Sequence, residues 1–249
     1  LTAVLIAISG KNPMTAYWAL LKGAFGSMDR IAFGLNRSTP YILAGVGVAL
    51  CFRAKVINIG AEGQIAIGGL AATAAALYLP QLPFAMIPGA IAAGAIGGAA
   101  WAGIAAVISV KRGVHEVLTT LLLNFVGLLL VGELLHGVLG EPGAGFPQST
   151  LLPELVWLPK LLPGTDLHVG ILIAILVVIA GHFVLWRTTF GFRLRLIGES
   201  RAAADYAGIS NSQCTFAIML TAGALAGMAG GIEILGVHYR LIDGFSLGF

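Results

Sequence analysis

Long apolar runs constrain this chain more than any other feature of its sequence. Several reach about 20 residues, the length that a helix needs to cross a bilayer. They show no sustained alternation of apolar and polar residues, which favours spanning helices over a β-barrel. Of the 249 residues, 58% are hydrophobic and only 10% are charged, outside the range of a soluble globular domain. We therefore expect an all-α polytopic membrane protein.

The apolar runs also predict how the chain is organised. It begins and ends inside such sequence, which predicts a fragment truncated at both ends. We expect one transmembrane domain over 1–249, with spans near 1–9 (partial), 41–51, 65–79, 84–110, 117–138, 169–186 and 214–235.

Charge predicts the topology of these spans. The cations at 111–112 and the four arginines of 187–211 place both segments in the cytoplasm, and the net negative loop 140–168 then lies outside. Segment 10–40 also falls outside, although it carries four cations against one acid, so the rule is satisfied only by the later loops. Topology thus explains the net charge of +3, and we expect membrane lipid rather than nucleic acid as a partner.

Between residues 52 and 69, polar side chains and glycines stand between two apolar runs. Backbone polar groups at membrane depth must find partners inside the protein, and a charge there is costly. Two interpretations remain open. Residues 58–64 could be a functional interruption of one membrane span, or they could form a short cytoplasmic turn between two hairpin helices, with Arg53 and Lys55 as ordinary anchors.

The motif in this stretch resembles a known family signature. Its residues are Phe52-Arg53 followed by Asn58-Ile59-Gly60-Ala61-Glu62-Gly63-Gln64. This pattern is similar to that of permease subunits of bacterial ATP-binding-cassette importers, in the branch serving nucleosides, simple sugars and branched-chain amino acids. Within that branch it most resembles nucleoside permeases that work with a basic-membrane-protein type lipoprotein.

The resemblance implies an importer transmembrane domain with a broken helix, placed in the bacterial plasma (inner) membrane and moving a nucleoside or simple sugar by alternating access. It also implies three kinds of partner: ATPase subunits, a second permease subunit and an extracytoplasmic solute-binding lipoprotein. The sequence contains no Gly-x-x-x-x-Gly-Lys-Ser/Thr phosphate loop, so ATP hydrolysis is expected on another polypeptide. We predict a transport subunit rather than an enzyme, with no catalytic set, cofactor or metal.

The cytoplasmic segment 187–211 contains a second candidate site. Residues 199–207 are good helix formers, and Gly208 stands where a C-terminal cap belongs. A short isolated helix is marginal alone, so a partner surface is expected to hold it, although a solvated linker is the alternative. The resemblance implies that this is the helix that couples to the ATPase, with the residues Glu199, Arg201, Ala202, Ala203, Asp205 and Gly208.

Candidate residues for the substrate pathway come from three places. Amides and a carboxylate can bind ribose hydroxyls or a base edge, and aromatic rings can stack on a base. An Asn in a spanning helix can equally bond a neighbouring helix, and a Phe can simply pack. The candidates are Asn58, Glu62 and Gln64 from the polar stretch, Asn124 and Phe125 from the span over 117–138, and Asp243 and Phe245 near the end of the chain.

Two rival functions and one internal similarity remain. An ion-coupled secondary transporter or channel would use Glu62, Glu133, His182 or Glu233 as its coupling group, and a membrane scaffold would use none of them. Residues 52–60 faintly resemble 239–244, and inverted repeats with paired broken helices are common in transporters.

Overall fold

The computed structural model describes residues 2–80 and 82–248, so Leu1 of the expected partial span lies outside it. The described residues are mostly helical and form no extended strand. Four helical segments are long and apolar enough to cross a membrane, namely Met86–Arg112, Glu116–His136, Gly170–Arg187 and Asn211–His238. The prediction of an all-α polytopic membrane protein is confirmed. The elements are α1 (Thr2–Ile8), α2 (Pro13–Phe25), α3 (Met28–Arg53), α4 (Ala61–Tyr78), α5 (Met86–Arg112), α6 (Glu116–His136), η1 (Glu154–Val156), α7 (Gly170–Arg187), α8 (Thr189–Glu199), α9 (Arg201–Tyr206), α10 (Asn211–Glu233) and η2 (Ile234–His238).

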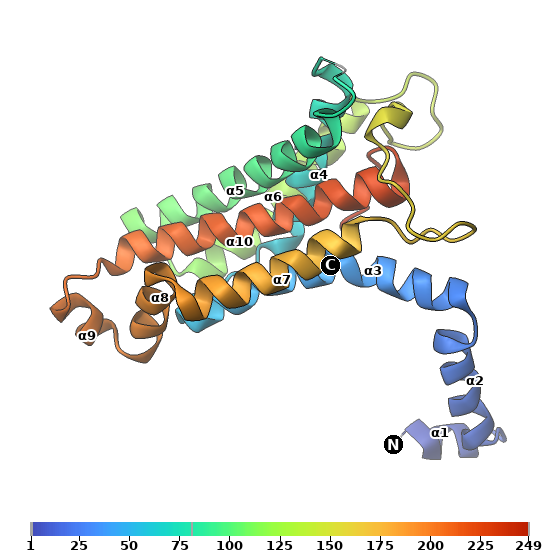
Figure 1. Cartoon of the computed structure of the whole chain (residues 1–249), viewed down its shortest axis with the longest axis horizontal. Coiled ribbons are helices and arrows are strands. Elements are labelled where there is room, and N and C mark those ends of the chain that lie inside the picture. The colour runs from blue at the N-terminus through green and yellow to red at the C-terminus, as the bar shows by residue number, and fades with distance from the viewer. Residues whose placement is uncertain (1, 81, 249) are drawn as a thin grey trace.

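Helix α10 is the centre of the bundle, because glycines let its neighbours approach closely (Figure 1). A Cβ added to Gly68 of α4 would overlap the backbone of Gly227, and one added to Gly98 of α5 would overlap the carbonyl of Gly223. Glycines four residues apart place these contacts on one face of each helix. The three helices thus form a core in which backbone packs on backbone.

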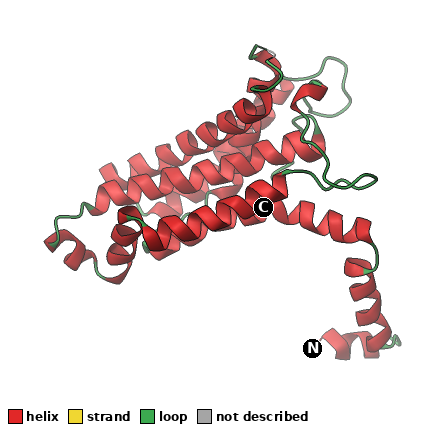
Figure 2. Ribbon diagram, in the orientation of Figure 1, coloured by secondary structure: helices red, strands yellow, loops and turns green. Residues whose placement is uncertain are grey.

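The connecting segments gather at the two ends of the bundle (Figure 1). Helices α8 and α9 lie at one end, beside the C-terminus of α5 and the start of α10. The loop over 137–168 lies at the other, and α1 and α2 project away from the bundle on that side (Figure 2). The two cation-rich segments expected in the cytoplasm are therefore at the same end of the molecule.

Helices α3 and α4 run in opposite directions. Along α3, Gly47 packs on Ala222 and Cys51 on Ile218, so α3 is antiparallel to α10. Helix α5 is also antiparallel to α10, because Gly94 packs on Gly227 and Gly98 on Gly223. A short turn then reverses the chain, so α6 runs antiparallel to α5 and parallel to α10. Along α4, Gly60 meets Thr120 and Gly63 meets Asn124, so α4 starts parallel to α6.

The stretch after Arg53 is therefore a connection between two helices, and not a break within one span. The half-helix expected over 41–51 is part of a continuous helix of 26 residues that begins at Met28 and contains Pro40. The polar and aromatic residues of 28–40 concealed that continuity in the sequence. The connection, residues 54–60, is partly buried: Ala54 and Val56 are each 1% exposed, whereas Ile57 and Ile59 are 39% and 47% exposed.

A second irregular segment follows α10. The helix passes into the π-helical turn η2 and stops at Tyr239, whose φ is +55°. Lys55, just after α3, has a φ of +52°, and these two are the described non-glycine residues with positive φ. The faint sequence similarity between 52–60 and 239–244 thus corresponds to a shared backbone feature, a helix end followed by an irregular stretch.

The long loop satisfies the backbone of this second segment. Leu158 donates to the carbonyl of Leu235 at 2.9 Å, and Leu152 donates to that of Tyr239 at 2.9 Å. The backbone N–H of Ser149 donates to the carbonyl of Leu241 at 2.8 Å, and the backbone N–H of Leu241 donates to the hydroxyl of Ser149 at 2.9 Å. Residues 148–158 therefore close one end of the bundle, as buried backbone groups require.

Candidate functional site

The connection between α3 and α4 is built on a pair of buried amides. Asn58 Nδ2 donates to Gln64 Oε1, and Gln64 Nε2 donates to Asn58 Oδ1, both at 3.2 Å. The same Oδ1 accepts a hydrogen bond from the backbone of Gly60 at 2.8 Å. The two side chains are 4% and 2% exposed. Since they satisfy each other, these amides hold the shape of the connection in this conformation and do not face a solute.

Asn124 of α6 caps the N-terminus of α4 from outside that helix. Its Oδ1 accepts from the backbone N–H of Gly63 at 2.9 Å, and its Nδ2 donates to the carbonyl of Ile59 at 2.8 Å. The first N–H groups of a helix have no partner within it, and Gly60 at the N-cap has no side chain to offer one. A neighbouring helix therefore supplies the cap, which fastens α6 to the connection.

Two further residues of this network were not singled out from the sequence. Thr120 Oγ1 accepts from the backbone of Ile59 at 3.3 Å, and Trp101 Nε1 donates to the carbonyl of Leu123 at 3.1 Å. The available signal was spacing. Thr120 precedes Asn124 by one helical turn inside an apolar run, so both polar groups lie on one face of α6.

A cavity of about 460 Å³ lies beside this network, between α3 and α6 and over the first turn of α4. Its walls are mostly apolar, with Tyr41 and Val48 of α3 on one side and Leu121 on the other, and Glu62 is the charged residue that lines it. The positive end of the α4 dipole favours the Glu62 carboxylate. No described residue forms an ion pair or hydrogen bond with that carboxylate, so it is available to a ligand.

The other expected pathway residues lie elsewhere. Phe125 is 60% exposed and does not line the cavity. Asp243 is exposed and lies near Gly132, which is about 12 Å further along α6 than Asn124 at the usual helical rise. Phe245 is buried, and its ring packs directly on Gly69 of α4. The structure therefore brings Asn58, Glu62, Gln64 and Asn124 together and leaves the other three apart from them.

The short helix expected within 199–207 is α9, which begins two residues later than expected, at Arg201, and ends at Tyr206. Glu199 is the last residue of α8, and Ser200 adopts an extended backbone between the helices. Its hydroxyl accepts from the backbone of Ala203 at 3.2 Å and so caps α9. Gly208, with a φ of +75°, has the left-handed conformation of a C-terminal cap, as expected.

Helix α9 is anchored by one residue and exposes the rest. Ala204 is fully buried, in the same apolar cluster as Ile197 of α8 and Val56 of the connection. Tyr206 is 97% exposed. The six expected coupling residues are exposed as well, namely Glu199 at the end of α8 and Arg201, Ala202, Ala203, Asp205 and Gly208 on or just after α9. The free face of α9 is thus joined to the connection by one buried cluster.

The candidate coupling groups of an ion-driven transporter have different surroundings. Glu233 is 2% exposed, with its Oε1 3.8 Å from Arg37 and 3.5 Å from His238. Burial lowers the pKa of the neighbouring His168, and the Glu233 charge opposes that effect. Glu133 and His182 are exposed. Glu233 is therefore a paired acid that ties the end of α10 to α3, and it lines none of the described cavities.

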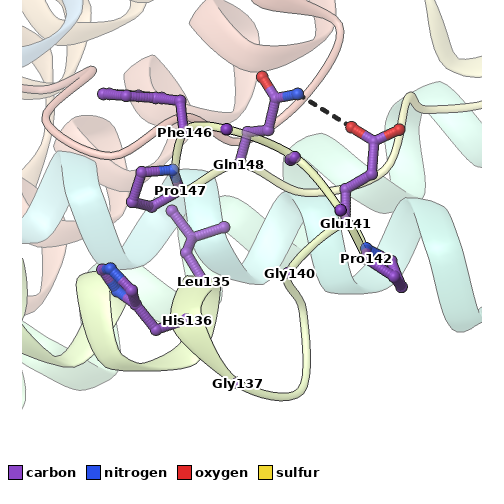
Figure 3. A pocket seen from close by; sticks show the side chains of 12 residues that line it. Leu135, His136, Gly137, Gly140, Glu141, Pro142, Phe146, Pro147 and Gln148 are labelled. Atoms are coloured by element: carbon purple, nitrogen blue, oxygen red, sulfur yellow. Dashed lines mark hydrogen bonds between the residues drawn. The ribbon is translucent and has the colours of Figure 1, made fainter.

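A polar hollow of about 460 Å³ lies at the far end of α6, within the loop over 137–148 (Figure 3). Figure 3 shows the Gln148 amide pointing at Glu141, to which it donates at 2.9 Å. Arg240 lies 3.2 Å from the same carboxylate. Because this acid is already paired, we place the candidate solute site beside Glu62.

Comparison with known proteins identifies the family. The model of a family described as the branched-chain amino acid transport system / permease component matches residues 30–249. No solved structure shows significant similarity to the chain.

Three relatives show the same relationship over nearly the whole chain. The glucose ABC transporter permease protein TsgB13 of Haloferax volcanii is 35% identical, over 96% of this chain and 65% of its own length. The guanosine ABC transporter permease protein NupP of Bacillus subtilis is 31% identical, over 99% and 72%. The nucleoside ABC transporter permease protein NupB of Lactococcus lactis is 29% identical, over 98% and 69%.

The chain thus spans about two thirds of the length of these relatives. The resemblance that the motif at 52–64 indicated is confirmed, and so is the prediction of a multi-pass protein of the plasma membrane. The chain belongs to the permease component family of branched-chain amino acid transport systems.

Proposed function

We propose that this chain is the membrane-spanning permease subunit of an ATP-driven importer and that it moves a nucleoside or a simple sugar. The observation that carries the proposal is the unpaired Glu62 carboxylate in a largely apolar cavity, within a chain of this family. A carboxylate can accept hydrogen bonds from two adjacent hydroxyls, which ribose and glucose both offer. The solutes for which the relatives are named, glucose, guanosine and nucleosides, all carry such hydroxyls.

The cavity between α3 and α6 is not enclosed by this chain alone. We infer that a second permease subunit covers this opening, so that the route runs between two subunits. Alternating access then requires α3 and α6 to move relative to each other around the network of Asn58, Gln64 and Asn124. In this proposal the amides act as the pivot, and Glu62 meets the solute.

In this proposal, a movement of the ATPase subunits is transmitted to the solute site through the buried apolar cluster that holds α9. The exposed face of α9 is offered to an ATPase subunit, and a solute-binding lipoprotein is proposed for the opposite side. Ala204, Ile197 and Val56 share one cluster, and Gly198 packs on the carbonyl of Arg53. A displacement of α9 would therefore move residues 54–60, the connection between α3 and α4, through these direct contacts.

Uptake by the full-length protein, reconstituted with the subunits that co-purify with it, tests the function. We expect ATP-dependent accumulation of a nucleoside or a simple sugar. Accumulation driven by a proton gradient without ATP would favour an ion-coupled transporter, and absence of any uptake would favour a scaffold.

Replacing Glu62 by Gln is expected to lower uptake about 10- to 100-fold, because hydrogen bonds to a charged acceptor contribute more than those to a neutral one. Initial rates measured over a range of solute concentrations check this. The matched control is Glu133→Gln, which changes an exposed acid on α6 that does not line the cavity. Equal uptake by the two variants would contradict the assignment of Glu62.

Replacing Ala203 by Trp is expected to reduce co-purification of the ATPase subunit more than about tenfold, because a bulky group at the centre of an interface prevents close packing. The fold should survive, since Ala203 is exposed. Ala24→Trp, on the exposed α2 at the other end of the molecule, is the control. If both variants retain the ATPase equally, the partner does not dock on α9.

A further inference from the structure

Two arginines from different helices lie around one tryptophan near α8. The guanidinium carbon of Arg53, the last residue of α3, is 5.5 Å from the centre of the Trp186 ring. That of Arg195, on α8, is 4.9 Å from the same ring. Cation–π attraction accounts for each contact, and together the two contacts place two positive charges around one ring.

Neither arginine has a carboxylate partner among the described residues, whose ion pairs involve other side chains. Arg195 donates a hydrogen bond to the carbonyl of Leu185, which leaves its charge uncompensated. The indole N–H of Trp186 has no hydrogen-bond partner within the described part of the chain. The cluster therefore offers donors and positive charge and lacks an anion.

The surroundings of the cluster are those of a membrane surface. Trp186 is in the last turn of α7 and is 49% exposed. Two more exposed rings are near the cluster in sequence: Phe52, the residue before Arg53, is 57% exposed, and Phe183, about one turn before Trp186 on α7, is 58% exposed. Helix α7 buries few of its own residues, as expected of a helix that faces lipid. Tryptophan gathers at the level of lipid headgroups, and the arginine-rich segment 187–211 is expected on the cytoplasmic side, where anionic lipids attract basic residues.

We propose that Arg53, Arg195 and Trp186 bind the phosphate of an anionic phospholipid, whose acyl chains lie against Phe52 and Phe183. Guanidinium groups recognise phosphate oxygens through paired hydrogen bonds, and the indole N–H is a further donor. A headgroup held there fastens the end of α3 to the α7–α8 hairpin. This site does not depend on which solute is transported.

Lipid retention by the full-length protein in its complex, measured by native mass spectrometry, tests the site. The wild type is expected to retain phosphatidylglycerol in preference to phosphatidylcholine. Arg53→Gln and Arg195→Gln should each lower that retention about fivefold, as the loss of one arginine near an anionic surface implies. Arg193→Gln is the matched control, because Arg193 is an exposed arginine of α8 that, within the described part of the chain, lies over no ring and is not one of the expected coupling residues.

A second measurement guards against variants that fold poorly. Phosphatidylglycerol should raise the melting temperature of the wild type and of Arg53→Lys, which keeps the charge, more than it raises that of Arg53→Gln. Equal retention in Arg53→Gln and Arg193→Gln would overturn the proposal. So would stabilisation by inorganic phosphate as large as that by the lipid, which indicates a free anion site, or displacement of the lipid by the ATPase subunit, which indicates an acidic protein partner.

Discussion

A single methyl group added to α5 is expected to disrupt the bundle in one position and to be harmless nine residues away. Replacing Gly98 by Ala should lower the free energy of unfolding by at least about 2 kcal/mol, because the new Cβ overlaps the carbonyl of Gly223 and lies 2.6 Å from the Cα of Gly227. Backbone atoms cannot rotate away as a flexible side chain would. Thermal or denaturant unfolding of the purified protein measures the change.

Gly89→Ala is the matched control on the same helix. A Cβ at Gly89 meets no described atom within 4 Å apart from its own stretch of helix, so the substitution should leave stability unchanged or raise it by about 0.5–1 kcal/mol through the better helix propensity of Ala. Equal effects of the two substitutions would mean that α5 and α10 do not approach as closely as described.

The spacing of small residues predicted this packing from sequence, but it could not name the partners. Glycines four apart in 94–98 and in 223–231 indicate a close helix contact in each segment. Which glycine faces which depends on crossing geometry that no local pattern records. The same limit explains the error at α3, where local composition placed the start of the span at residue 41 although the helix begins at Met28. The missing part is held by distant segments, since Asn36 donates to the carbonyl of Asp166 and Arg37 pairs with Glu233 of α10.

The candidate site was predictable in its residue types and less so in its roles. Polar side chains between apolar runs do mark the irregular segment, because unpaired polar groups at that depth are costly. Whether an amide binds a solute or a backbone depends on distances between α4 and α6. Asn124 and Gln64 proved to be partners of backbone and of Asn58, whereas Glu62, one residue before Gly63, was left unpaired. The sequence therefore indicates which polar residues lie near the irregular segment, but their hydrogen-bond partners depend on the folded structure.

Replacing Asn124 by Leu is expected to destabilise the protein by about 2–6 kcal/mol and to abolish uptake. The substitution keeps the approximate volume but removes both side-chain bonds, so the N–H of Gly63 and the carbonyl of Ile59 lose partners in a buried position. Each unsatisfied buried group costs about 1–3 kcal/mol. Unfolding measurements give the total, and hydrogen exchange at residues 59–64 should show faster exchange of the Gly63 amide.

Phe125→Leu is the control, since the neighbouring side chain is exposed and bonds nothing in the connection, and its effect on stability should stay within about 0.5 kcal/mol. The two variants separate the cap from general changes in α6. If the Gly63 amide keeps its protection in Asn124→Leu, the start of α4 is capped by something other than α6. The pivot proposed for alternating access would then lose its link between the two helices, because Thr120 reaches only Ile59, one turn before Gly63.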